Sequence, residues 1–252
     1  MFKNCIALSN ISSLASMDVS SVEDMSYLFY NCKQLTNLEP LRNWETGNVK
    51  LMKYTFAVDG YSGLTTLEPL KDWDVSSVTD MTAMFGAAGG YGYSDTSCKD
   101  ASALINWDVR NVTHMSRLFE GFRLQDYEFL KSWNIASLQK ADYLFAYHWL
   151  MEADANRSLD LSTWDVKNVD FGYAGPLFNG RYLINFIPFK NINDSAFYID
   201  GCSSLSVESL VAIFNNLTTT FSVKKIIIGQ QNMDKLTDEQ LFIALEKGWT
   251  IA

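Results

Sequence analysis

The sequence predicts an α/β repeat coil, and its central observation is the stretch from Trp73 to Phe85, W-D-V-S-S-V-T-D-M-T-A-M-F. Counted from the tryptophan, apolar residues lie at +2, +5, +8, +11 and +12. Neither a helix alone nor a strand alone gives that spacing. One short strand, a turn and a short helical or 3₁₀ segment would give it. Two further observations are that this stretch recurs along most of the chain and that its copies are regularly spaced.

The recurring stretch defines a repeat of about 30 residues. Its lead residues are Met17, Trp44, Trp73, Trp107, Trp133, Trp164 and Ile187, at intervals of 27, 29, 34, 26, 31 and 23 residues. Periods of roughly 20 to 50 residues indicate repeat arrays, and this one is too short for a propeller blade or a helical hairpin. We therefore expect a leucine-rich-repeat-like, right-handed solenoid of about seven rungs, each with a short parallel strand and a short helix or 3₁₀ turn.

The pattern changes after Cys202, which predicts two regions: a repeat solenoid over residues 1–205 and a terminal cap over 206–252. The cap is expected to contain two helices and two strands. Its signals are Ser206 as a helix N-cap, the strand Val223 to Ile228, the capping box that begins at Thr237, Gly248 as a C-cap and the strand Trp249 to Ile251.

Residues 73–81, W-D-V-S-S-V-T-D-M, and residues 28–35, L-F-Y-N-C-K-Q-L, resemble the BspA-like leucine-rich repeat family of bacterial surface proteins. The resemblance covers most of residues 1–205. It implies a non-enzymatic recognition or adhesion module of a cell-surface or secreted protein, with a protein or glycan ligand on a host or neighbouring cell. The alternatives are a phage tail or host-attachment protein and a structural spacer. The resemblance implies no catalytic residue.

Residues 1–8 match residues 28–35, the second half of a repeat. We therefore expect that the chain is cut from a longer protein with other domains, and that an export signal lies upstream. The expected location is extracellular or on the cell surface.

The net charge of −9 argues against binding to nucleic acid or to an anionic membrane surface, because either would need clustered Lys and Arg. No run of 18 apolar residues is present, so the sequence encodes no membrane insertion.

One candidate binding surface is a row of acids one position after the lead residues. Its members are Asp18, Glu45, Asp74, Asp108 and Asp165. If the lead and +2 side chains point inward, the +1 side chain points outward, and the rungs stack these carboxylates on one face. The row could bind a cation or a basic partner. Alternatively, each Asp could accept hydrogen bonds from the backbone of the following turn.

The second candidate surface is aromatic and comes from insertions that occupy the same place in the repeat. The insertions carry Tyr61, Tyr91, Tyr93, Tyr147 and Trp149. Tyrosine and tryptophan on adaptable loops give a large contact area at low entropic cost, which suits a sugar or a partner side chain. These rings could instead fold back and seal their own insertions.

No catalytic or metal site is predicted. The cysteines form no C-x-x-C pair, and Cys5, Cys32 and Cys202 share one register, so we expect buried thiols, with a Cys5–Cys32 bridge as the alternative. His114 and His148 lie in different rungs and registers. We therefore predict no enzyme and no cofactor; a glycan-cleaving enzyme on a solenoid, acting through two carboxylates, is the remaining alternative.

Overall fold

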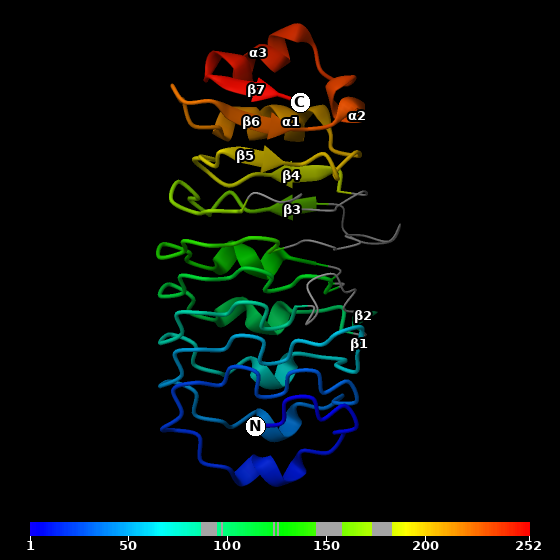
Figure 1. Ribbon diagram of the computed structural model, residues 1–252, viewed down its shortest axis with the longest axis vertical. Helices are drawn as coiled ribbons and strands as arrows, with labels where there is room; N and C mark the ends of the chain where they lie inside the picture. Colours follow the sequence, from blue (N-terminus) through cyan, green and yellow to red (C-terminus); the bar gives the residue numbers. More distant parts are fainter. Residues whose placement is uncertain (87–94, 97, 123, 125, 145–157, 173–182) are drawn as a thin grey trace.

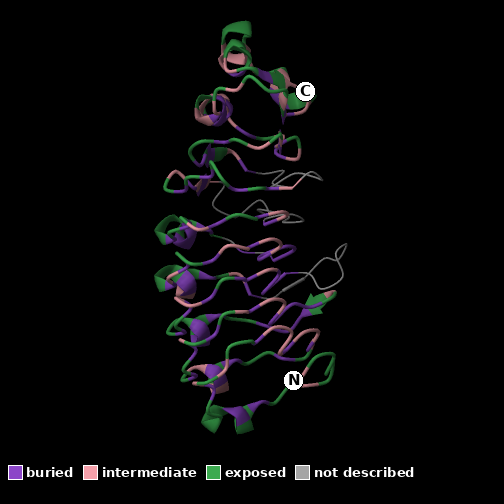
Figure 2. Ribbon diagram, turned by 60° about the vertical axis from the view of Figure 1, so that its left-hand side comes forward, coloured by how far each residue is buried: buried purple, intermediate pink, exposed green. Residues whose placement is uncertain are grey.

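The computed structural model describes residues 1–86, 95–96, 98–122, 124, 126–144, 158–172 and 183–252. The chain runs back and forth in layers that stack along the long axis, from the first 3₁₀ turn at one end to helix α3 at the other (Figure 1). Buried residues line the inside of the layers and exposed residues follow the outer turns (Figure 2). We name each layer by its lead residue.

The regular elements are short. Five 3₁₀ turns precede lead residues: η1 (Ser12–Ser16), η2 (Glu39–Leu41), η3 (Glu68–Leu70), η4 (Ser102–Asn106) and η5 (Glu128–Ser132). The strands are β1 (Tyr61–Ser62), β2 (Asp95–Thr96), β3 (Ser158–Asp160), β4 (Asn185–Ile187), β5 (Ala196–Tyr198), β6 (Lys224–Ile227) and β7 (Trp249–Ile251). The α-helices are α1 (Val207–Asn216), α2 (Gln230–Met233) and α3 (Asp238–Glu246).

The expected leucine-rich-repeat-like solenoid of about seven rungs is wrong. The described strands form three separate parallel sheets, β1-β2, β3-β4 and β5-β6-β7, and all three α-helices follow residue 206. The lead segments at Trp44, Trp73 and Trp107 contain no strand, and isolated bridges such as Leu51 to Asp80 join neighbouring layers there. The 3₁₀ turns also precede the lead residue, whereas the repeat spacing predicts a helical segment after it.

Two backbone features explain why the lead segments do not form a strand. The side chain at +1 accepts a hydrogen bond from the backbone N–H two residues later, as the Asp74 carboxylate does from Ser76. This bond turns the chain directly after the lead residue. The residue at +10 then has a positive φ, for example 54° at Tyr54 and 60° at Arg117, in the left-handed region where extended backbone ends. Each extended stretch is therefore too short to pair with its neighbour at more than one residue.

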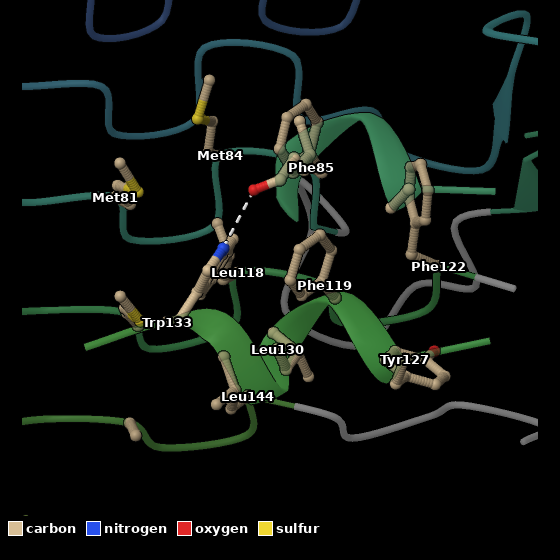
Figure 3. Close-up of a cluster of buried hydrophobic side chains, with 14 of the residues drawn as sticks. Met81, Met84, Phe85, Leu118, Phe119, Phe122, Tyr127, Leu130, Trp133 and Leu144 are labelled. Carbon is tan, nitrogen blue, oxygen red and sulfur yellow. Dashed lines mark hydrogen bonds between the residues drawn. The ribbon is translucent and has the colours of Figure 1, made fainter. Parts of the chain in front are cut away.

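The core is a set of columns in which equivalent side chains of successive layers touch. Phe2, Phe29, Phe56, Phe85 and Phe119 stack with centroids 5.4 to 5.8 Å apart and ring planes within 8° of parallel. Figure 3 shows part of this column beside the buried methionine and leucine side chains of the same layers. The apolar positions predicted from the Trp73 to Phe85 spacing are buried in that layer.

A second column is made by the tryptophans. The indole N–H of each of the five lead tryptophans donates to the carbonyl of a leucine in the preceding layer at 3.0 Å, and Figure 3 draws this bond from Trp133 as a dashed line. The pairs are Trp44 with Leu14, Trp73 with Leu41, Trp107 with Leu70, Trp133 with Leu104 and Trp164 with Leu130. Because a buried indole N–H needs an acceptor, this bond fixes the register of one layer on the next.

The predicted capping signals are present in the C-terminal elements, but the short helix α2 is a third helix that was not predicted. Ser206 accepts a hydrogen bond from the Ser209 N–H at the start of α1, and Thr237 and Gln240 form both bonds of a capping box at the start of α3. Gly248 has a φ of +86° after α3. Strand β5 lies before residue 206, while its sheet partners β6 and β7 lie after it. The division at 205/206 remains a prediction.

Candidate functional site

Four of the five acids of the row are engaged in local turns. Asp18, Asp74, Asp108 and Asp165 each accept a hydrogen bond from the backbone N–H two residues later, at 2.9 to 3.3 Å. This is the turn alternative that the sequence analysis left open. The four side chains still reach solvent, with Asp108 half-buried and the others exposed.

The bonds around three of these carboxylates lower their pKa. For Asp18 the cause is the Ser20 hydroxyl and N–H, and for Asp108 it is chiefly the Arg110 side chain. The Asn191 amide, at 2.9 Å, lowers the pKa of Asp165. These hydrogen bonds favour the charged form of Asp18, Asp108 and Asp165.

Glu45 and Asp74 line a shallow hollow of about 520 Å³ between two layers. Gly47 lies at +3 of its repeat, where the neighbouring layers carry Ser20 and Ser76, and its missing side chain helps to open the surface. Most of the remaining lining is polar, including Arg42, Asn43, Asn48 and Asp72, and Trp44 also contributes to it.

Of the predicted aromatic insertion residues, the structure describes Tyr61. It lies in β1 with 54% of its surface exposed. The other four, Tyr91, Tyr93, Tyr147 and Trp149, lie outside the described residues. Whether the insertions form one aromatic edge therefore remains a prediction.

The structure places a different group of aromatic residues together, which we call the tyrosine cluster: Tyr27, Tyr30 and Tyr54, with Lys3. The Tyr27 and Tyr54 rings stack 5.0 Å apart at 8°, and Tyr30 meets both at a steep angle. The Lys3 ammonium lies 4.5 Å from the Tyr27 ring centroid and 5.2 Å from that of Tyr30. All three tyrosines are half-buried, so their rings are fixed by contacts and yet reach solvent.

Burial raises the pKa of the phenols of Tyr30 and Tyr54, and the nearby Asp59 carboxylate adds to the shift at Tyr30. Asp59 belongs to the insertion that carries Tyr61, so this insertion adjoins the tyrosine cluster. The tyrosine cluster does not follow from the apolar spacing of the repeat. The available signal was tyrosine at +10 in the Met17, Trp44 and Trp133 repeats.

The cysteines are free thiols, so the Cys5–Cys32 bridge is not formed. Cys32, Cys98 and Cys202 are buried as expected, but Cys5 is exposed. Burial raises the pKa of Cys32 and Cys98 to about 11, which keeps both protonated and unreactive at neutral pH.

Among the described residues, no group of three or more His, Cys, Asp or Glu side chains is placed to hold a metal ion. The Nδ1 atom of His114 lies 2.8 Å from the Thr113 hydroxyl. His148 lies outside the described residues. In the part of the chain that the structure describes, no helix is both long and apolar enough to cross a membrane.

One protein family matches the chain. Its model, described as "Mycoplasma protein of unknown function, DUF285", matches residues 1–97 and again residues 90–174. Comparison with curated proteins and with solved structures gave no match. The two matched segments cover more than half of the sequence, and the second begins near the end of the first, as expected of a repeated unit. The chain therefore belongs to the DUF285 family.

Proposed function

We propose that this chain is a non-enzymatic recognition module of a cell-surface or secreted protein, and that it binds a protein or glycan ligand through the tyrosine cluster and the adjoining insertion. The observation that carries the proposal is the cluster itself. Its rings are held in place by stacking and by the Lys3 ammonium, and they remain accessible. Aromatic rings that are already ordered lose little entropy on binding.

The resemblance of the W-D-V-S-S-V-T-D-M repeats to the BspA-like surface proteins supports the same role and the proposed extracellular location. The polar hollow at Gly47 offers a second contact area, because one layer contributes both Tyr54 and the Trp44 to Asn48 lining. The tyrosine faces would stack on sugar rings or apolar side chains, and the hollow would hydrogen-bond polar groups.

The test is a screen of the purified chain against glycan and protein arrays, followed by titration of the strongest ligand. The test variant is Tyr27→Asn with Tyr54→Asn, because asparagine tolerates the positive φ of both positions. Tyr198→Asn is the matched control, since Tyr198 is a half-buried tyrosine on β5, outside the cluster. Tyr61→Ala tests the insertion separately.

We expect the double variant to weaken binding at least about tenfold, equivalent to about 1.4 kcal/mol, and the control to leave it unchanged. Equal binding by the double variant, or no ligand on either array, would contradict the proposal. Mass spectrometry of the recovered ligand tests the non-enzymatic part, because a cleaved ligand would show that the chain is an enzyme.

A further inference from the structure

The 3₁₀ turns lie one above another on one side of the stack, and each runs across the long axis (Figures 1 and 2). Counted back from the lead residue, positions −5 and −2 are three residues apart, so their side chains lie on the same side of a 3₁₀ turn. In the layers led by Trp44, Trp73, Trp107 and Trp133 these side chains are exposed, except for Arg42, which is half-buried. We call this surface the turn face; its members are Glu39, Arg42, Glu68, Lys71, Ser102, Ile105, Glu128 and Lys131.

Three of these four layers carry an acid at −5 and a base at −2. The pairs are Glu39 with Arg42, Glu68 with Lys71 and Glu128 with Lys131. The first two pairs are in contact, at 2.6 and 2.9 Å, and Lys131 contacts Asp160 of the following layer. Each of the three layers therefore has its negative end on one side of the turn face and its positive end on the other.

The Trp107 layer interrupts this row of charges. It has Ser102 at −5 and Ile105 at −2, and Ile105 is 46% exposed. A hollow of about 410 Å³ lies beside it. The lining residues are Glu68, Lys71, Asp72, Ser102, Ala103, Ile105 and Asn106. The turn face therefore has an apolar centre with charged layers on both sides, which is the usual anatomy of a protein–protein interface.

We propose that the turn face binds the turn face of a second copy of this chain, about a two-fold axis that lies between the copies and parallel to the stack. This axis sets each layer opposite the same layer of the second copy and reverses the direction across the turn. The acid at −5 then lies opposite a base at −2. Glu68 faces Lys71 of the second copy, and Lys71 faces Glu68 of the second copy. Glu39 with Arg42 and Glu128 with Lys131 form the equivalent pairs.

Charge complementarity identifies the occupant as a second copy. A partner must offer a base opposite each acid and an acid opposite each base, in three layers at once and at the layer spacing of about 4.8 Å. The chain itself carries that pattern. A two-fold contact is isologous, so one self-complementary face is enough to form it.

The centre of the contact is apolar. Ile105 lies close to the axis, where it can pack on Ile105 and the half-buried Ala103 of the second copy. The four layers span about 14 Å at the usual strand spacing, so the contact is small. We therefore expect a weak, reversible dimer. This inference goes beyond the proposed ligand of the tyrosine cluster, whose three tyrosines follow the lead residue in the repeat.

Analytical ultracentrifugation of the full 252-residue chain measures the equilibrium between monomer and dimer over a range of protein concentrations. Lys71→Glu places an acid opposite Glu68 of the second copy, and Glu68→Lys places a base opposite Lys71. Each variant alone therefore repels its own copy. An equimolar mixture of the two variants sets opposite charges against each other at both contacts, so the mixture should associate.

Two more variants complete the test. Ile105→Asp removes the apolar centre. Lys50→Glu is the matched control, because Lys50 is an exposed lysine in a 2.9 Å ion pair with Glu23, outside the turn face. Circular dichroism melting shows which variants are folded. All the substituted side chains are exposed, so we expect each variant to fold.

We expect the unmodified chain to dimerise as its concentration rises. The dimer should be at least about tenfold weaker in Lys71→Glu, Glu68→Lys and Ile105→Asp, unchanged in Lys50→Glu, and recovered in the mixture of Lys71→Glu with Glu68→Lys. A chain that stays monomeric at every concentration would overturn the proposal, because the turn face would then need a different occupant. A dimer that is insensitive to the three turn-face variants, or a mixture that associates no better than its components, would also overturn it.

Discussion

The indole nitrogen of Trp107 donates a hydrogen bond to the carbonyl oxygen of Leu70, 37 residues earlier, at 3.0 Å. The same carbonyl accepts the backbone N–H of Trp73 at 3.1 Å, at the end of η3. One oxygen therefore closes a 3₁₀ turn and fixes the next layer above it. Four other tryptophans repeat the indole bond to a leucine of the preceding layer.

Replacing Trp107 by phenylalanine should destabilise the chain by about 1 to 3 kcal/mol, because the variant loses the hydrogen bond and part of the buried ring. Urea unfolding followed by circular dichroism measures the change. A benzothienyl analogue of tryptophan at position 107 is the control, since it keeps the two-ring shape and lacks the N–H. Native stability of the analogue would show that the bond contributes nothing.

A methyl group at Gly86 should force two layers apart. A Cβ there would lie 2.2 Å from the carbonyl oxygen of Arg117, which is backbone and cannot move aside. We expect Gly86→Ala to cost about 1 to 3 kcal/mol, as overpacking usually does. Thermal melting compares it with Gly47→Ala, whose Cβ would meet only the end of the Asp74 side chain at 3.0 Å. Equal melting temperatures for the two variants would refute the close approach of the layers at Gly86.

Glu120 makes the free energy of unfolding depend on pH, and its ion-pair partner Arg117 reduces that dependence. Its side chain is fully buried, and both carboxylate oxygens accept hydrogen bonds from Nη1 of Arg117 at 2.8 and 2.9 Å. Burial raises the pKa of Glu120, and Arg117 opposes that shift. Without the guanidinium the pKa should rise further, because the buried charge is then unpaired.

The sign of the effect follows from proton linkage. A folded-state pKa above the unfolded value means that the folded protein holds a proton that the unfolded chain releases, so stability falls as pH rises above about 4.5. We expect Arg117→Met to destabilise by about 3 kcal/mol at pH 7 and by clearly less at pH 4. Adding Glu120→Gln should abolish the difference between the two pH values. A deficit that is the same at both would contradict this account.

Substitutions at Asp74 test whether the acids of the row stabilise local turns. Its carboxylate accepts the Ser76 N–H at 2.9 Å, a bond that an asparagine side chain could also accept. Asp74→Ala should therefore lower the free energy of unfolding by about 1 kcal/mol, while Asp74→Asn should leave it nearly unchanged. If Asn is as destabilising as Ala, the hydrogen bond to the Ser76 N–H is not what Asp74 contributes, and the turn account would be contradicted.

The apolar spacing of the repeat was enough to predict burial at Trp73, Val75, Val78 and Met81, each of which is at most 3% exposed. It was not enough to predict the backbone. The spacing does not predict the left-handed φ of 51° at Ala83, and an alanine at that position does not indicate it either. The spacing also does not predict the early turn at +1. Extended pairing was therefore overestimated, and the 3₁₀ turns were placed on the wrong side of the lead residue.

Of the aromatic candidate surfaces, the exposed position of Tyr61 could be predicted from the sequence, and the tyrosine cluster could not. The position of Tyr61 on an exposed insertion follows from the length of its gap, since insertions in repeats lie outside the stacked core. The tyrosine cluster could not be found from that rule. Tyr27 and Tyr54 lie 27 residues apart, and they meet only because their layers are adjacent and both backbones turn at +10.

The most direct test of the layered arrangement is hydrogen exchange of the tryptophan indole N–H groups, followed by NMR of ¹⁵N-labelled protein. The account predicts that the indoles of Trp44, Trp73, Trp107, Trp133 and Trp164 exchange slowly, because each is buried and bonded to a leucine carbonyl of the layer before it. Exchange of these five at the rate of free indole, with the chain folded, would contradict it.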